Sequence, residues 1–195
     1  MDQRKDIARE IARRYVTLSK DALDKFAEIL IPLKFKRGEM PVKEGEVCDN
    51  LYYIEKGLTR QYYVKNGKEV TEHLEYEGGI VMCIESFFRR EPSRLVIETL
   101  EPSKIYAIPY DKLKELTRTS YEFCQLMFAF LEHSLILSQH KADTLRFESA
   151  KERYLRTLND HPDLVRRAPL HYLASYLQMT PETLSRVRTS TNKSN

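Results

Sequence analysis

The chain has 195 residues, of which 42% are hydrophobic and 31% are charged, and its formal net charge is only +3. It has no run of eighteen apolar residues and no basic, apolar leader after Met1, so we expect a soluble, cytoplasmic protein without a membrane partner. Its three cysteines, Cys48, Cys83 and Cys124, are widely spaced and form no Cys-x-x-Cys pair. This argues against a disulfide framework and against a zinc or iron–sulfur site, and we predict no metal and no cofactor.

The N-terminal segment has apolar residues at helical spacings, which predict two helices within the first thirty residues. The hydroxyl of Ser19 is expected to cap the second helix, and Pro32 is expected to lie beyond its end. From Leu33 to Pro109 the sequence changes to short runs of β-branched and aromatic residues separated by glycine-containing turns. The pair Asn66-Gly67 predicts a two-residue hairpin turn, because both central positions of such a turn need positive φ. Many short strands of this kind indicate an antiparallel sandwich or jelly roll.

Beyond Pro109 the pattern is helical again, with a short helix expected over 111–118 and a long one over 120–144. The long helix has two apolar stripes about a hundred degrees apart. We expect one stripe to pack on the β-rich segment and the other on the same helix of a second subunit, which predicts a homodimer. Burial of the whole helix in one large core is the alternative. The first stripe contains Phe123, Met127, Phe130 and Leu137, and the second contains Cys124, Phe128, Leu131, Leu135, Ala142 and Leu145. The residues assigned to the dimer helix are Phe123, Met127, Phe130, Leu131, Leu135 and Leu137.

The last part of the chain contains a helix over 150–159, a break at His161-Pro162 and then the segment LHYLASYLQMTPETLSRVR. This segment is typical of a helix-turn-helix, in which two helices cross closely and need a small residue in the first helix. Ala174 is that small residue. Thr180 can cap the second helix, and Pro181 suits its first position, where a missing N–H costs nothing. The polar tail over 189–195 is expected to fray.

The second helix turns Leu184 and Val187 inward, and its outer face suits a DNA major groove. Arginine can donate two hydrogen bonds to guanine, glutamate can accept one from cytosine, and hydroxyl groups can bind phosphate. The candidate DNA-binding residues are Thr180, Glu182, Thr183, Ser185, Arg186 and Arg188. From Arg146 onward nine basic residues stand against five acidic ones, which agrees with this location. The alternative is an ordinary solvated helix in a small bundle.

One position departs from the usual motif. The fourth residue after Ala174 is often glycine, because the chain commonly adopts a left-handed conformation there, and here it is Gln178. A non-glycine residue in that conformation costs roughly 1–2 kcal/mol. The turn is therefore either slightly strained or differently shaped.

The order of a β-rich segment, a long two-faced helix and a C-terminal helix-turn-helix resembles the family of the cyclic-AMP receptor protein and the fumarate and nitrate reduction regulator (Crp/Fnr). The segments 43–46 and 51–57 resemble its early jelly-roll strands, and 173–188 resembles its DNA reader. The resemblance implies an α+β fold with three parts. These are a cyclic-nucleotide-binding-like domain over 1–118, a dimerisation helix over 119–146 and a helix-turn-helix domain over 147–195. By position, Thr180, Glu182 and Arg186 match the family's phosphate-binding and base-reading residues, while Pro181 replaces a commonly basic one, so a different operator is expected.

The family's cyclic-nucleotide cassette is altered over 82–95. Glu85 could replace the ribose ligand, but no glycine precedes it, and Ser93-Arg94 reverses the Arg-Ser order expected at the cyclic phosphate. A shift of one residue along a strand turns a side chain to the opposite face. Cyclic AMP is therefore not the expected effector, and the pocket either takes another small molecule or is vestigial. The candidate effector-pocket residues are Glu85, Ser86, Ser93 and Arg94.

These observations predict a homodimeric transcription regulator that binds double-stranded DNA at an inverted repeat, with RNA polymerase as a further candidate partner. One alternative is a cyclic-nucleotide sensor whose helical tail docks a protein. A second is a metalloenzyme on a cupin-like barrel. The five histidines show no metal-triad spacing on the strands, which disfavours the enzyme. They are His73, His133, His140, His161 and His171. A haem ligated by His73 is likewise not favoured.

Overall fold

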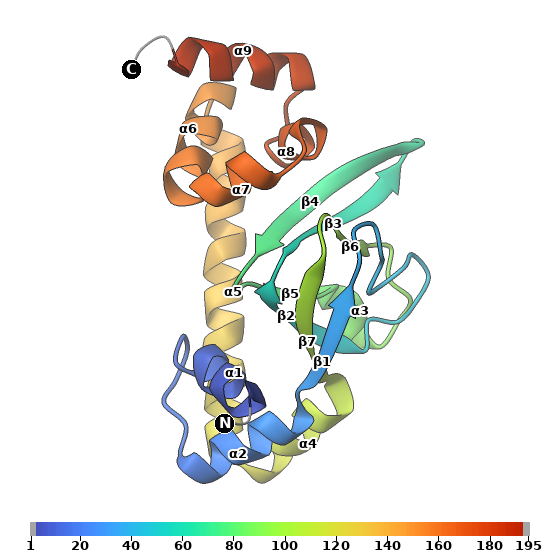
Figure 1. Ribbon diagram of the computed structural model, residues 1–195, viewed down its shortest axis with the longest axis vertical. Coiled ribbons are helices and arrows are strands. Elements are labelled where there is room, and N and C mark those ends of the chain that lie inside the picture. The colour runs from blue at the N-terminus through green and yellow to red at the C-terminus, as the bar shows by residue number, and fades with distance from the viewer. Residues whose placement is uncertain (1–2, 193–195) are drawn as a thin grey trace.

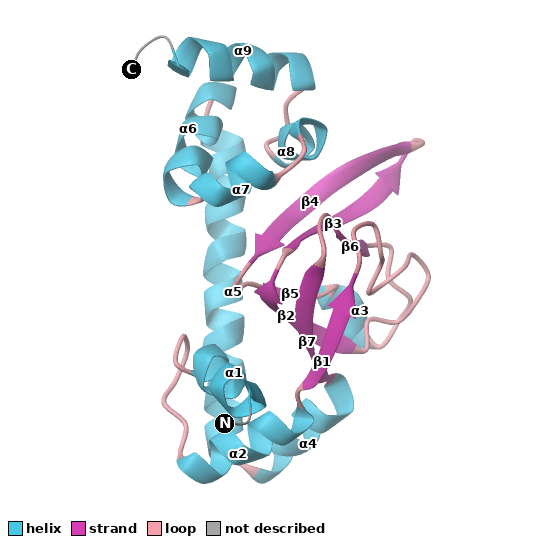
Figure 2. Cartoon of the chain, viewed as in Figure 1, coloured by secondary structure: helices cyan, strands magenta, loops and turns pink. Residues whose placement is uncertain are grey.

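The computed structural model describes residues 3–192 and has an elongated shape. One long helix, α5 (Tyr121–Phe147), runs through the molecule as a spine (Figure 1). The N-terminal helices lie at one end of this spine and the C-terminal helices at the other, and the β-strands lie between them on one side (Figure 2). The α+β fold class predicted from the sequence is thereby confirmed.

Two helices precede the strands, α1 (Gln3–Ala12) and α2 (Lys20–Ile29). The predicted cap is confirmed, because Ser19 Oγ accepts the backbone N–H of Ala22 at 3.2 Å. Ser19 also donates its backbone N–H and its hydroxyl to Glu122, which ties α2 to the start of α5. Pro32 lies in the edge strand β1, where its missing N–H removes no hydrogen bond from the interior of the sheet.

The strands form two antiparallel sheets, ordered β1-β7-β2-β5 and β4-β3-β6. Asn66 and Gly67 have φ of 52° and 72° and join two paired strands, so the predicted hairpin turn is confirmed. We call the strands together with the short helix α3 (Ile84–Arg89) the β unit. The strand bounds are β1 (Ile31–Phe35), β2 (Asn50–Lys56), β3 (Leu58–Lys65), β4 (Lys68–Tyr76), β5 (Ile80–Val81), β6 (Val96–Thr99) and β7 (Ser103–Pro109).

Helix α4 (Tyr110–Thr119) follows the sheets and leads into α5. The first stripe of α5 enters the core at Phe123 and Phe130, whereas the second stripe lies bare, with Phe128 71% and Leu135 72% exposed. Leu137, assigned to the first stripe, is 54% exposed, so this stripe leaves the core before the helix ends. Burial of the whole helix in one core is therefore wrong.

The remaining helices form what we call the C-terminal unit: α6 (Ala150–Asp160), α7 (Pro162–Arg167), α8 (Leu170–Tyr176) and α9 (Pro181–Asn192). The break expected at His161-Pro162 is confirmed, because His161 lies between α6 and α7, and Pro162 is the first residue of α7, a helix that was not expected. Helix α9 continues to residue 192, so the prediction that the chain frays from Thr189 is wrong for 189–192. Residues 193–195 lie outside the described residues.

Two hydrophobic clusters hold these parts together. The larger joins both sheets to α1, α2 and the first half of α5. The smaller joins the C-terminal unit to Leu58, Leu74 and Leu100 of the β unit. Because the second cluster contains side chains from both units, the C-terminal unit is packed against the β unit. Within residues 3–192, no helix has the length and hydropathy that crossing a membrane requires.

Candidate nucleic-acid interface

Helices α8 and α9 form the predicted helix-turn-helix. Leu173, Ala174 and Leu184 are completely buried where the two helices meet. The start of α9 is fixed as expected, because Thr180 Oγ1 accepts the backbone N–H of Thr183 at 3.2 Å and Pro181 is the first helical residue. Burial of one side of α9 leaves its opposite side to solvent at the far end of the molecule from α2 (Figure 1).

The residues predicted to contact DNA lie on this outer side. Thr180, Glu182, Ser185 and Arg186 are exposed, while Thr183 and Arg188 are partly covered. Hydrogen bonds from the N–H of Glu182 itself and from Thr180 lower the pKa of the Glu182 carboxyl, which keeps it an acceptor. The side of α9 away from the core thus presents an arginine, a carboxylate and hydroxyl groups together.

The turn between the two helices contains Gln178 in the left-handed conformation, with φ of 51°. The N–H of Met179 bonds to the carbonyl of Ala174, and the N–H of Gln178 bonds to that of Ser175. This pair of bonds is the Schellman pattern, in which the left-handed residue is usually glycine. The strained form of the turn is therefore the one adopted.

Arg153, which the sequence did not single out, stabilises this turn. Arg153 of α6 donates to the carbonyl of Leu177 at 2.8 Å, to that of Gln178 at 3.3 Å and to that of Glu148 at 2.6 Å. One guanidinium thus binds three carbonyl oxygens that the helix ends leave without a partner. The contact spans 24 residues, so no local pattern could reveal it.

The C-terminal unit is also held by an arginine of β3. Arg60 is only 2% exposed and forms ion pairs with Glu69 and Glu98, both at 2.6 Å. Its guanidinium lies 3.9 Å from the ring centre of Tyr62 and 3.6 Å from that of Tyr172. Because Tyr172 belongs to α8, this stack joins the β unit directly to the helix-turn-helix.

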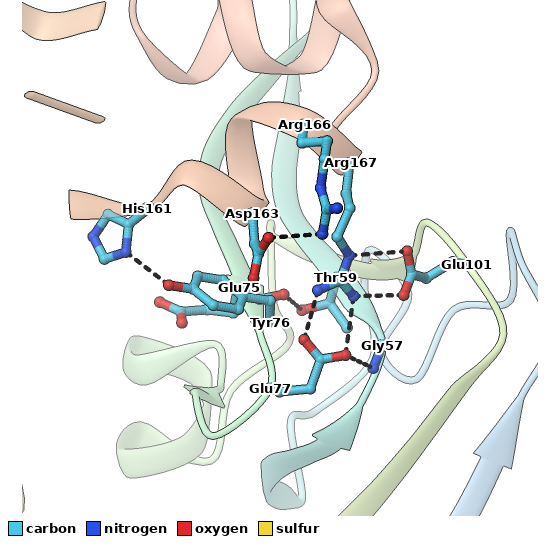
Figure 3. A network of polar contacts seen from close by, with 10 residues as sticks. All are labelled: Gly57, Thr59, Glu75, Tyr76, Glu77, Glu101, His161, Asp163, Arg166 and Arg167. Carbon is cyan, nitrogen blue, oxygen red and sulfur yellow. Dashed lines mark hydrogen bonds and ion pairs between the residues drawn. The ribbon is translucent and has the colours of Figure 1, made fainter. Parts of the chain in front are cut away.

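A second arginine also connects the two units, but this one belongs to the C-terminal unit and binds carboxylates next to the strands. Arg167 of α7 forms ion pairs with Glu77 at 2.6 Å and with Glu101 at 2.5 Å (Figure 3). Although desolvation raises the pKa of Glu77, hydrogen bonds from Arg167 and from the N–H of Gly57 outweigh it and lower this pKa to about 2. Beside these pairs, Tyr76 Oη and His161 Nδ1 share a hydrogen bond of 3.0 Å.

The two units also meet through the backbone of a sheet edge. Strand β4 ends one sheet, and α8 lies against it. The N–H of Thr71 donates to Ser175 Oγ at 2.9 Å, so a helix side chain satisfies a donor that an edge strand would leave free. Together with the Arg60 stack and the Arg167 pairs, this contact forms what we call the clasp between the β unit and the C-terminal unit.

The structure does not bring the four candidate effector-pocket residues together. Glu85 is exposed and pairs with Arg89, and Arg94 is also exposed. Ser86 and Ser93 are buried, but their hydroxyl groups already bond to the backbone of neighbouring residues. None of the four therefore offers a free polar group inside the β unit.

Arg90 belongs to the same segment, 82–95, and its guanidinium is also bound within the chain. It donates to the carbonyls of Cys48 at 3.0 Å and Phe87 at 3.3 Å, pairs with Asp49 and stacks on Tyr110. A buried cyclic phosphate needs a cation in one fixed place. The guanidinium of Arg90 is bound within the chain.

The positions of the possible metal-ligating side chains can be compared with the sequence analysis. Over residues 3–192, no group of three or more His, Cys, Asp or Glu side chains is placed to hold a metal ion. His73 and His161, two of the histidines considered for such a role, lie on β4 and before α7, where His161 bonds Tyr76.

Comparison with known proteins agrees with this architecture. The family model for the cyclic nucleotide-binding domain matches residues 32–120. The c-di-GMP responsive global regulator CLP of Xanthomonas campestris is 18% identical, with a TM-score of 0.68 over 90% of this chain and 93% of that one. FixK2 of Bradyrhizobium japonicum is 16% identical, with a TM-score of 0.71 over 85% and 86%. The catabolite activator protein of Thermus thermophilus is 20% identical, with a TM-score of 0.56 over 91% and 85%. No curated protein matches the chain.

Residues 32–120 are similar to the cyclic nucleotide-binding domain, and the chain has the fold of the solved Crp/Fnr regulators. The resemblance predicted from the sequence is thus confirmed. Several of the matched structures are named as regulators or as cyclic nucleotide-binding proteins.

Proposed function

We propose that the chain is a sequence-specific DNA-binding transcription regulator that acts as a homodimer. The observation that carries the proposal is the outer side of α9. Its opposite side is anchored by the fully buried Leu184, while Glu182, Ser185 and Arg186 face solvent at the end of the molecule. A helix held in this way can enter a major groove with its first turns against the base edges.

The proposed dimer uses the second stripe of α5. Phe128, Leu131 and Leu135 are exposed on one side of the helix, although each is a large apolar residue. Rows of this kind pair with an identical row across a two-fold axis. Two α9 helices would then read successive major grooves about 34–36 Å apart, and the preferred site would be an inverted repeat.

In this proposal the clasp determines how α9 is presented. The C-terminal unit shares a hydrophobic cluster with the β unit and is held by Arg60 and Arg167. An effector bound to the β unit would act by changing the population of this docked arrangement. We do not expect cyclic AMP as the effector, because Ser86, Ser93 and Arg90 are already bonded within the chain; the pocket either takes another small molecule or is vestigial.

Selection of bound DNA from a random pool tests the function, and the proposal predicts an inverted repeat. Arg186→Ala should then weaken binding to the preferred site by about 1–3 kcal/mol and relax base choice at one position of each half-site. Arg89→Ala, an exposed arginine of the β unit, is the matched control and should bind as the wild type does. Equal loss on preferred and random DNA would show that Arg186 contacts phosphate only, and recovery of no sequence would overturn the proposal.

Analytical ultracentrifugation tests the dimer. Each leucine loses about 1.5–3 kcal/mol when its burial is lost and a homodimer contains two copies, so Leu135→Glu should raise the dimer dissociation constant by about 100-fold or more. His140→Glu places the same charge on a different side of α5 and should leave the constant unchanged. A wild-type chain that remains monomeric at micromolar concentration would exclude this interface.

The family match of residues 32–120 favours one other candidate, a cyclic-nucleotide sensor whose C-terminal unit docks a protein. Calorimetry with cyclic AMP and cyclic GMP separates the two. Binding of a cyclic nucleotide without any DNA binding would support the sensor. DNA binding that weakens steeply with rising salt, as counterions are released, would support the regulator.

A further inference from the structure

Two of the three cysteines meet inside the β unit, although they are 35 positions apart. Cys48 lies just before β2, and Cys83 lies just before α3. Their exposed fractions are 0% and 1%. The backbone N–H of Cys83 donates to Cys48 Sγ at 3.4 Å, and the two thiols are within hydrogen-bonding reach of each other. The pair is therefore a dithiol and not two isolated buried residues.

The polar surroundings of the pair favour a thiolate on Cys83. Gln61 of β3 is buried and donates its Nε2 to Cys83 Sγ at 3.6 Å and to the carbonyl of Met82 at 2.9 Å. Hydrogen bonds from the Cys48 thiol, and then from Ser93 and Gln61, lower the pKa of Cys83 against the desolvation that raises it. Cys48 has the opposite tendency, because its interaction with Cys83 and its burial both raise the pKa of its thiol, which donates to the carbonyl of Asn50 at 3.4 Å.

A short and partly exposed element covers the pair. Helix α3 has only six residues, and two of its apolar side chains, Ile84 and Phe88, are 48% and 39% exposed. Although Phe87 of α3 is buried, short elements with exposed apolar side chains are among the segments that open locally below the global unfolding free energy. Such openings admit a small oxidant to sulfur atoms that are covered in the resting fold.

We propose that Cys48 and Cys83 form a redox-active site in which a hydroperoxide oxidises the two thiols to an intramolecular disulfide. The Cys83 thiolate attacks one peroxide oxygen, the O–O bond breaks, and the leaving oxygen departs as water or an alcohol after taking a proton. Cys83 is then a sulfenic acid. The Cys48 sulfur attacks the Cys83 sulfur, the S–O bond breaks, and hydroxide leaves as water with the thiol proton. Two thiols and one hydroperoxide thus become one disulfide, one alcohol or water, and one further water.

This site is independent of DNA binding, and it occupies a place where the cyclic-nucleotide cassette is altered. The bond would join the loop before β2 to the start of α3. Ser86 of α3 accepts the N–H of Cys48 at 2.9 Å and Cys48 Sγ accepts the N–H of Cys83 at 3.4 Å, so the two segments are already in contact.

The experiment uses the full chain carrying Cys124→Ser, which removes the exposed third thiol. The reduced protein is treated with hydrogen peroxide, quenched with N-ethylmaleimide and digested without reductant for mass spectrometry. The expected result is loss of both free thiols, a peptide containing Cys48 linked to one containing Cys83, and return of both thiols with dithiothreitol. In the unsubstituted chain, the free thiols should fall from three to one.

Two single variants in the same background test the order of events. Cys48→Ser should leave Cys83 to form a sulfenic acid that dimedone traps, whereas Cys83→Ser should leave Cys48 unmodified. If either variant fails to fold by circular dichroism, the peptide map of the parent protein still decides. Both thiols remaining alkylatable after peroxide, or irreversible oxidation of Cys83 without a link to Cys48, would overturn the proposal.

Discussion

Glu75 is a carboxylate whose replacement should stabilise the protein at neutral pH. It lies on β4, and its Oε2 is so close to Gly79 that a β-carbon there would be 2.4 Å away. Desolvation raises the pKa of Glu75 to about 7, although Arg14 and Lys141 both lower it. The ordinary value is 4.5, so the folded state retains a proton that the unfolded state has released over pH 4.5–7.

The sign and size of the effect follow from this difference. A raised carboxyl pKa contributes stability that is complete below about pH 4.5 and is lost as the pH rises through 7. The difference of about 2.5 in pKa corresponds to at most about 3.5 kcal/mol at about 1.4 kcal/mol per unit, and the partial exposure of the side chain brings this to roughly 1–3 kcal/mol. Glu75→Gln has no such loss, so its stability relative to the wild type should rise by that amount between pH 4.5 and pH 8.

The pH dependence of the wild-type unfolding free energy would not by itself reveal this effect. Desolvation and Lys141 lower the pKa of His73 to about 4, so its contribution is complete above pH 6.5 and is lost as the pH falls toward 4. The slopes of Glu75 and His73 oppose each other over pH 4.5–6.5. The difference between variant and wild type at each pH is therefore the diagnostic quantity.

Urea unfolding followed by far-UV circular dichroism measures this difference, because the chain has no tryptophan to serve as a fluorescent probe. Protein concentration must be fixed, since a dimer gains stability with concentration. Glu132→Gln, on the exposed side of α5, controls for removal of one surface carboxylate. A difference between Glu75→Gln and wild type that stays constant from pH 5 to pH 8 would refute the reasoning and place the carboxylate in water.

Three further substitutions test the turn and the clasp. Gln178→Gly should stabilise the chain by about 0.5–1 kcal/mol in urea unfolding, because the relief of left-handed strain exceeds the added freedom of the unfolded chain; Gln178→Ala should bring no such gain. Arg167→Met leaves Glu77 and Glu101 without their cation, so it should destabilise by about 1–3 kcal/mol, and NMR titration should show the pKa of Glu77 returning from about 2 toward 4.5. Tyr172→Ala removes one aromatic ring from the Arg60 stack, an interaction worth up to about 2 kcal/mol, and should speed hydrogen exchange in α8. Tyr172→Phe keeps the ring and should not change this exchange. Equal exchange in both variants would show that the stack does not hold this helix.

Features that act on adjacent backbone were predictable from the sequence. The cap at Ser19, the hairpin at Asn66-Gly67 and the start of α9 at Thr180-Pro181 each depend on residues within three positions of one another. Helices α3 and α7 were not predicted, because six residues make fewer than two turns and give almost no periodicity.

Contacts between distant segments could not be predicted. Arg60 meets Tyr172, and Arg153 meets Leu177, only after the sheets and helices have folded over one another. The effector-pocket residues illustrate the same limit, since Ser86 and Ser93 have suitable chemistry but bond to nearby backbone once folded. Nothing in the sequence distinguishes a free hydroxyl from an occupied one.

Strand β3 connects the Cys48–Cys83 pair to the clasp. Gln61 contacts Cys83, and its neighbours Arg60 and Tyr62 form the stack that holds Tyr172 of α8. Successive residues of a strand point to opposite faces, so β3 has the dithiol on one side and the C-terminal unit on the other. The pairing register of β3 with β4 shifts between Gln61 and Tyr62. The contact with Cys83 and the stack with Tyr172 therefore lie on adjacent residues of β3, at the point where its pairing with β4 is irregular.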